Sequence, residues 1–213
     1  MKHLAHSFAR PMRRIGGLLC MWMFAMLTAC STVPQKPATS AQAPAGHGTV
    51  LVRVTANSLK KMFSFSLEAR PSGSKGAQQG IFFAGWGMQS EGYWTVVEDH
   101  LDKGQLVALQ IPAGSYEFYR FHAQTATIAG TKSITPNPYF SVPFNVSPGE
   151  TVYLGEVYFQ FNDRSRPHLR TDLGDTFFAI SIRDNRAKDL KEATGKIAGL
   201  DKSAVVIRLL KQP

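Results

Sequence analysis

The sequence VLVRVT occupies residues 50–55, and a second stretch, FSFSLE, occupies residues 63–68. In both stretches, apolar side chains recur at every second position, which is the period of a β-strand with one buried face. The three valines of the first stretch would share its buried face, and Arg53 and Thr55 would lie on the opposite face. The two stretches therefore predict half-buried strands.

The same period-two pattern recurs along the rest of the chain, with turn-forming residues between its copies. The clearest turns are Pro112-Ala113-Gly114 and Ser147-Pro148-Gly149. Many short strands at close spacing with such turns indicate an all-β domain, an antiparallel β-sandwich or a barrel. Further strands are expected at about residues 80–86, 93–98, 105–111, 115–122, 139–146, 151–161, 176–183 and 204–210.

The strand expected at residues 151–161 carries the most prominent apolar set. Strict alternation places Tyr153, Val157, Phe159 and Phe161 on one of its faces. We expect this face to fill the core.

One stretch, residues 185–197, has the period of an α-helix instead. Ala187, Leu190 and Ile197 fall on one helical face, and Asp184 is placed to cap the first turn. The sequence therefore predicts one short C-terminal helix, which we expect to cover one end or edge of the sheets.

Two motifs in the middle of the chain carry a resemblance. They read IPAGSY at residues 111–116 and FNVSPGETVYLG at residues 144–155. Proline fixes φ on entry to each turn, glycine supplies positive φ, and the following aromatic residue begins the next strand facing inward. The pair resembles two hairpins of the prealbumin-like (transthyretin or carboxypeptidase-regulatory-like) β-sandwich found in uncharacterised bacterial lipoproteins. The resemblance implies an antiparallel sandwich of this type and transfers no catalytic residue.

The N-terminus has the organisation of a secretory signal. Four lysines and arginines, with no acidic residue, precede an apolar run at about residues 15–29. This run is shorter than the roughly 20 residues of a membrane-spanning helix. It ends in Leu27-Thr28-Ala29-Cys30, which resembles the lipobox of bacterial lipoproteins. The resemblance implies a signal peptide at residues 1–29, cleavage before Cys30, and a lipid on Cys30 that holds the chain on a membrane.

The residues after Cys30 suggest where the mature chain would go. Ser31 stands where the family's inner-membrane retention signal has aspartate, so the resemblance implies an outer-membrane protein facing the periplasm or the cell surface. Cys20 lies in the discarded segment, and the mature chain therefore has no disulfide. Residues 30–48 are rich in Pro, Ala, Ser and Gln, and we expect a lipidated flexible tether there, followed by one β-sandwich domain at residues 49–213.

The charge of the chain argues against a nucleic-acid partner. Removal of the four signal-peptide cations lowers the formal net charge from +9 to +5, and the remaining cations are scattered along the sequence. A nucleic-acid-binding protein would show a concentrated basic stripe or a recognition motif. We therefore expect no nucleic-acid partner. The expected partners are the membrane and an envelope protein or glycan.

No catalytic, metal-binding or cofactor-binding constellation is apparent in the sequence. No histidine pair has metal-ligand spacing, and no glycine-rich nucleotide fingerprint is present. We therefore expect a binding or structural module of the cell envelope. The alternative is an envelope hydrolase that acts on glycan or peptide through carboxylates such as Glu98, Asp99 and Glu156, brought together by the fold.

The best candidate for a binding surface is the segment GIFFAGWGMQSEGYW at residues 80–94. If Phe83 points into the core, alternation directs Phe82 and Trp86 outward, and glycines on both sides leave Trp86 room to project. Exposed aromatic side chains are typical of partner-binding surfaces. We expect these rings mainly to pack in the core, because aromatic residues bury large areas. The alternative is a ligand or partner surface that contains Phe82, Trp86, Tyr93 and Trp94.

Overall fold

A computed structural model shows the chain in two units, Met1–Pro34 and Gln35–Pro213. The residues that the structure describes all belong to the second unit: 36–57, 62–74, 80–86, 102–127, 130–134, 140–162 and 177–212. Within these ranges, no helix is long and apolar enough to cross a membrane.

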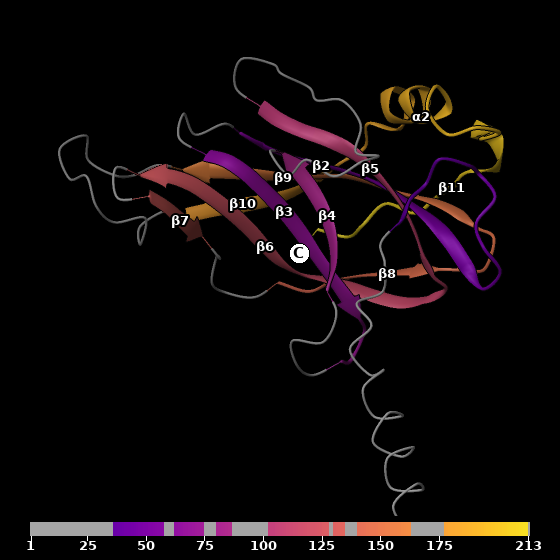
Figure 1. Ribbon diagram of the computed structural model, residues 1–213, viewed down its shortest axis with the longest axis horizontal. Helices are drawn as coiled ribbons and strands as arrows, with labels where there is room; N and C mark the ends of the chain where they lie inside the picture. The colour runs from indigo at the N-terminus through magenta and orange to yellow at the C-terminus, as the bar shows by residue number, and fades with distance from the viewer. Residues whose placement is uncertain are drawn as a thin grey trace, which may run out of the picture. The chain divides into compact units, whose positions relative to one another are not determined.

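The described strands form two sheets (Figure 1). The first has the order β1-β5-β2-β9-β10, with β11 pairing β9, and the second has the order β4-β3-β6-β7, with β8 pairing β6. The strands of the first sheet are β1 (Lys36–Pro37), β2 (His47–Asn57), β5 (Asp102–Pro112), β9 (Thr151–Asn162), β10 (Phe177–Arg183) and β11 (Val206–Ile207). Those of the second are β3 (Met62–Pro71), β4 (Ile81–Trp86), β6 (Gly114–Thr127), β7 (Gly130–Ile134) and β8 (Val142–Val146).

The prediction of a β-rich domain with one C-terminal helix is confirmed, but the strands are not all antiparallel. β9 runs parallel to its neighbours β2 and β11. Both predicted turns also differ from hairpins, because β5 and β6 belong to different sheets, as do β8 and β9. β9 follows β8, which lies in the other sheet, so no tight hairpin joins β9 to β2. β9 is therefore not required to be antiparallel to β2.

The glycines of the two turns behave differently. Gly149 has φ of 72°, as the turn prediction requires. Gly114 is not among the glycines of positive φ, so the expected reason for glycine is wrong at this turn. Tyr116 nevertheless lies in the core as predicted, with its ring centroid 5.5 Å from that of Phe144.

The inner faces of the two sheets share one apolar core. It contains Val50, Val52 and Val54 from β2, packed in one cluster with aromatic residues such as Phe65 and Phe118 from the second sheet. The prediction that β2 is half-buried is wrong, because it is buried from residue 48 to residue 56. A second cluster covers its other face.

This second cluster lies on the outer face of the six-stranded sheet. Helix α2 (Arg186–Thr194) supplies Leu190 and Ala193, which pack with Leu51, Leu106 and other residues of the sheet. The helix therefore covers a face rather than the predicted end or edge. Its N-cap is Asn185 and not Asp184, whose carboxylate instead accepts a hydrogen bond from the backbone N–H of Arg186 at 3.1 Å.

A bulge in β9 changes which residues face the core. Tyr153 pairs with Leu51, whereas the next regular pair joins Glu156 to Arg53, and Gly155 between them has φ of 96°. One extra residue reverses the alternation. Tyr153 therefore packs in the outer cluster, and Val157 and Phe159 pack in the inner core, so the prediction of one shared face is wrong for Tyr153. The side chain of Phe161 lies outside the described residues.

The C-terminal part of the expected tether is built into the domain. β1 pairs with β5, and Ala38 is fully buried in the outer cluster, where its backbone N–H donates to the carbonyl of Ala108 at 3.0 Å. The backbone N–H of Ala41 donates to the carbonyl of Ala198, also at 3.0 Å. A flexible tether over residues 36–48 is therefore contradicted, and residues 30–35 lie outside the described part of the chain.

Candidate functional site

Most of the residues proposed from sequence fall outside the described ranges. This holds for Cys30, Tyr93, Trp94, Glu98 and Asp99. The proposed residues inside the described ranges are Phe82, Trp86 and Glu156.

The aromatic strand β4 follows the predicted alternation only in part. Phe83 is fully buried and Phe82 is 43 % exposed, as predicted. Ser66 then pairs with Ala84, but Phe65 pairs with Trp86, so that Gly85 is an extra residue. The alternation from Phe83 therefore does not determine the face of Trp86, whose side chain lies outside the described part.

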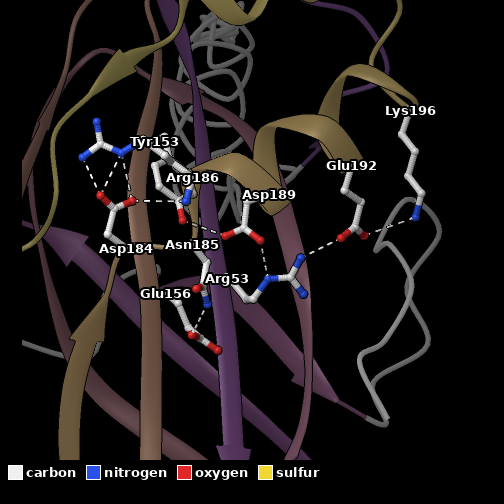
Figure 2. Close-up of polar contacts among 9 residues, drawn as sticks. All are labelled: Arg53, Tyr153, Glu156, Asp184, Asn185, Arg186, Asp189, Glu192 and Lys196. Atoms are coloured by element: carbon white, nitrogen blue, oxygen red, sulfur yellow. Dashed lines mark hydrogen bonds and ion pairs between the residues drawn. The ribbon is translucent and has the colours of Figure 1, made fainter. Parts of the chain in front are cut away.

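The outer face of β2 holds a polar network that the sequence analysis did not anticipate. Arg53 is only 2 % exposed and lies beneath α2 (Figure 2). Its Nε donates to Asp189 Oδ1 and its Nη2 donates to Glu192 Oε2, each at 2.6 Å. Tyr153 donates its hydroxyl to the other oxygen of Asp189 at 2.7 Å. Two carboxylates one turn apart on α2 thus clamp one guanidinium group.

The electrostatics of this network fix its protonation. Burial lowers the pKa of Arg53, but the charges and hydrogen bonds of Asp189 and Glu192 outweigh it, so the pKa is raised. The pKa of Tyr153 is also raised, first by burial and then by its hydrogen bond to Asp189. At neutral pH, Arg53 is therefore charged and Tyr153 is a neutral donor.

Two polar atoms beside the network have no hydrogen-bond partner among the described residues. They are Nη1 of Arg53 and Oγ1 of Thr55, and both residues are at least nine-tenths buried. A buried polar group without a partner destabilises a fold by about 1 to 3 kcal/mol. Such groups are rare in folded proteins and call for a bound ligand, a water molecule or a functional reason.

Both residues line a cavity of about 150 Å³. The cavity lies where β2, β5, β9 and β10 meet the start of α2, and its lining residues are all polar or charged. They are Arg53, Thr55, Asp102, Glu156, Arg183, Asn185 and Lys188.

The carboxylates of the cavity are held by neighbours. Glu156 is 4 % exposed and accepts a hydrogen bond from the amide of Asn185 at 2.5 Å (Figure 2). Asp102 accepts one from the hydroxyl of Tyr158 at 2.8 Å, and the guanidinium of Arg183 lies 3.3 Å from the centre of the Tyr158 ring. The cavity therefore presents two oriented carboxylates together with the cationic residues Arg53, Arg183 and Lys188.

The cavity was missed because the sequence analysis assigned Arg53 and Thr55 to an exposed face. The stretch VLVRVT contained a usable signal, because apolar Leu51 lies on the same strand face as Arg53 and Thr55. Strands with such continuous apolar runs are buried on both faces. A charged residue inside such a run needs a buried partner.

Within the described ranges, no group of three or more histidine, cysteine, aspartate or glutamate residues is arranged to hold a metal ion.

Comparisons with known proteins supply no family. No protein-family model matches the sequence, and no curated protein matches it significantly. One matching solved structure is a leucine-rich repeat protein from Bacteroides thetaiotaomicron, with 13 % identity and a TM-score of 0.32. The match covers 55 % of this chain and 14 % of that one. This likeness is too weak to carry an argument about fold or function.

Proposed function

We propose that this chain is a lipid-anchored binding module of the bacterial cell envelope, and that its two-sheet domain is a prealbumin-like β-sandwich. The observation that supports binding is the cavity itself, where three cationic and two anionic side chains converge with Thr55 and Asn185. Convergent charged and polar groups around one cavity are typical of a ligand-binding site. The binding site in this proposal is the cavity around Arg53.

The anchor in this proposal is the lipid on Cys30, at the outer membrane on its periplasmic side. Five residues separate Cys30 from Lys36, where pairing with β5 begins. An extended chain advances about 3.5 Å per residue, so the domain would stay within about 20 Å of the lipid. The cavity would therefore act on ligands close to the membrane surface.

The anchor is tested by Cys30→Ser in cells. The variant should leave the membrane fraction and keep the thermal midpoint of the parent, because Cys30 precedes the domain. If the variant stayed in the outer-membrane fraction after a high-salt wash, the lipid would not be the main attachment.

The binding site is tested by NMR on the full chain in detergent. A soluble digest of bacterial envelope, containing saccharides, peptides and phosphates, should shift resonances of residues that line the cavity. Saturable shifts confined to other surfaces, or no shifts at all, would contradict the proposal.

The hydrolase alternative rests on Glu156, which shares the cavity with a second carboxylate, Asp102. Glycosidases use two carboxyl groups, one as the general acid and the other as the general base or nucleophile. Here each carboxylate already accepts a hydrogen bond from a neighbouring side chain. Release of reducing ends from an envelope glycan, lost in Glu156→Gln, would establish the hydrolase instead.

The aromatic surface remains a second proposed contact, for a protein partner. Phe82, 43 % exposed, is its described member, and Trp86, Tyr93 and Trp94 complete it in the proposal. Phe82→Ser should weaken crosslinking to an envelope protein and leave ligand binding at the cavity unchanged. Unaltered crosslinking would remove Phe82 from the interface.

A further inference from the structure

The open edges of the two sheets differ in how they are protected against pairing with another chain. An open edge presents N–H and C=O groups that can bind an extended segment, and proteins prevent this with short strands, bulges, lysine or proline. β1 and β11 contain two residues each. β4 contains the bulge at Gly85, β7 contains Lys132, and β8 contains Pro143. Each of these edges therefore carries a known form of protection.

The edge strand β10 lacks all of these forms of protection. It reads FFAISIR over seven residues, with no proline and no charge before Arg183, and its pairing with β9 has no bulge. It ends the strand order of the first sheet, so among the described strands only β9 pairs with it. Ile180 and Ile182 pack against the inner core but are only partly buried. The edge therefore offers both backbone groups and apolar surface to a further strand.

The side chain of Gln212 takes the place of a neighbouring strand at one position of this edge. Its carboxamide oxygen accepts a hydrogen bond from the backbone N–H of Ile182 at 3.2 Å, and its Nε2 donates to the carbonyl of Ile182 at 3.1 Å. A residue in a hydrogen-bonded antiparallel pair makes the same two bonds. Backbone groups point to alternate sides along a strand, so those of Phe178 and Ile180 face the same edge as those of Ile182.

We propose that the edge of β10 is an interface with a second copy of this chain, formed by antiparallel pairing of the two β10 strands about Ile180. In this register, Ile180 pairs with Ile180 of the second copy, and Phe178 pairs with Ile182. β-Branched cross-strand pairs stabilise such ladders, and like charges directly opposite each other destabilise them. Arg183 falls opposite Phe177, so the arginines of the two copies are not opposed. The strand is therefore complementary to itself.

The symmetry of this pairing limits the size of the assembly. Each copy contributes the same edge, so a two-fold contact uses both edges and leaves none open. The product is a dimer and not a filament. Pairing along one strand edge also buries much less than the roughly 1,600 Å² of a standard interface, so the dimer should be weak.

Gln212 competes with this pairing. In each copy, its carboxamide occupies the backbone groups of Ile182 that Phe178 of the other copy would bind. With both carboxamides in place, only the central pair at Ile180 can form. Loss of the Gln212 side chain should therefore strengthen the dimer.

The test is sedimentation equilibrium of the full chain in density-matched detergent over a range of concentrations. Gln212→Ala should lower the dissociation constant of the dimer by about tenfold, because a competing pair of hydrogen bonds is removed in each copy. Its thermal midpoint should stay close to that of the parent, since Gln212 is exposed. The matched control is Gln42→Ala, an exposed glutamine elsewhere in the chain, which should leave the dissociation constant unchanged.

Two charge variants test the register in the Gln212→Ala background. Ala179 is exposed and Ser181 is partly buried, and the proposed register places each opposite the other in the second copy. Ala179→Lys with Ser181→Lys opposes like charges at both positions, and Ala179→Glu with Ser181→Glu does the same. Each double variant alone should therefore be monomeric. An equimolar mixture of the two should form a dimer, because the opposed charges are then of opposite sign.

Three results would overturn the proposal. The first is an equal dissociation constant for Gln212→Ala and the parent. The second is a dimer that persists in each double charge variant alone, since the interface would then lie elsewhere. The third is growth of the Gln212→Ala variant into species larger than a dimer, which a two-fold pairing of β10 does not allow.

Discussion

The two faces of strand β2 follow different rules. On its inner face, Val50, Val52 and Val54 meet other apolar side chains, and every contact contributes to stability. On its outer face, the cover by α2 ends in a polar network, and Arg53 and Thr55 keep buried atoms that have no partner among the described residues. Burial alone therefore does not identify a residue that stabilises the fold. The inner face builds the core, and the outer face keeps polar atoms buried at a cost in stability.

The largest expected effect concerns the inner face. Phe159 is fully buried, and its ring centroid lies 4.0 Å from that of Phe121. Phe159→Ala should lower the free energy of unfolding by about 3 to 5 kcal/mol, measured by urea denaturation. The control is Gln160→Ala, an exposed neighbour on the same strand. An unchanged midpoint for Phe159→Ala would show that the inner face is assigned wrongly.

The next effect breaks the clamp on the outer face. Asp189→Asn keeps the size of the side chain and removes the charge that faces Arg53, and it should cost about 1.5 to 3 kcal/mol. Glu192→Gln is the matched control, because Glu192 is 19 % exposed whereas Asp189 is fully buried. Chemical denaturation should show a much larger loss of stability for Asp189→Asn than for Glu192→Gln. The reverse order would contradict the role of Asp189 as the main partner.

A smaller effect tests the bulge that separates the two faces of β9. Gly155→Ala places a side chain at φ of 96° and brings its Cβ to 3.1 Å from the carbonyl of Arg183. It should lower stability by about 1 to 3 kcal/mol in thermal unfolding. Gly149→Ala has a similar φ of 72° but open space around the Cβ, so it should cost less. Equal losses would mean that the close approach is unimportant.

The smallest expected effect is a dependence of stability on pH, which arises from the salt bridge between Glu150 and Arg208. Burial raises the pKa of Glu150, but hydrogen bonds from Arg208 and the backbone of Ser147 outweigh it, and the pKa is lowered. A lowered carboxyl pKa stabilises the fold above the unfolded value, and this contribution disappears as pH falls through the folded value. Because Arg208 is 39 % exposed, we expect less than about 1 kcal/mol, lost below about pH 4.5.

This dependence is measured by urea unfolding at several values between about pH 6 and pH 3. Arg208→Gln should flatten the part of the curve that Glu150 contributes. An identical curve for parent and variant would show that the bridge does not form in solution.

The sequence predicted the β-rich class, most of the described strands and the C-terminal helix, because periodicity is a local property. It missed the short strands β1 and β7, and the strand expected at residues 93–98 lies outside the described residues. It also placed Phe82 and Phe83 on opposite faces. It could not predict the parallel pairing of β9, because that depends on which sheet each connection enters. The bulges at Gly85 and Gly155 each add one residue, and this reverses every later inference from alternation.

The candidate site was beyond local patterns for the same reason. Arg53 finds its partner Asp189 at a separation of 136 residues. Only the fold brings α2 onto the outer face of β2, where the cavity forms. The sequence shows an arginine in a strand, and the structure shows which of its atoms is unsatisfied.

The most direct test of the central claim, that the cavity on the outer face of β2 binds a ligand, is NMR of the full chain titrated with the soluble envelope digest. Resonances of Thr55, Asn185 and Lys188, which line the cavity, should shift and saturate, whereas those of Val50 and Val52 in the inner core should stay unchanged. Saturable shifts confined to other surfaces, with none at the cavity, would contradict the claim.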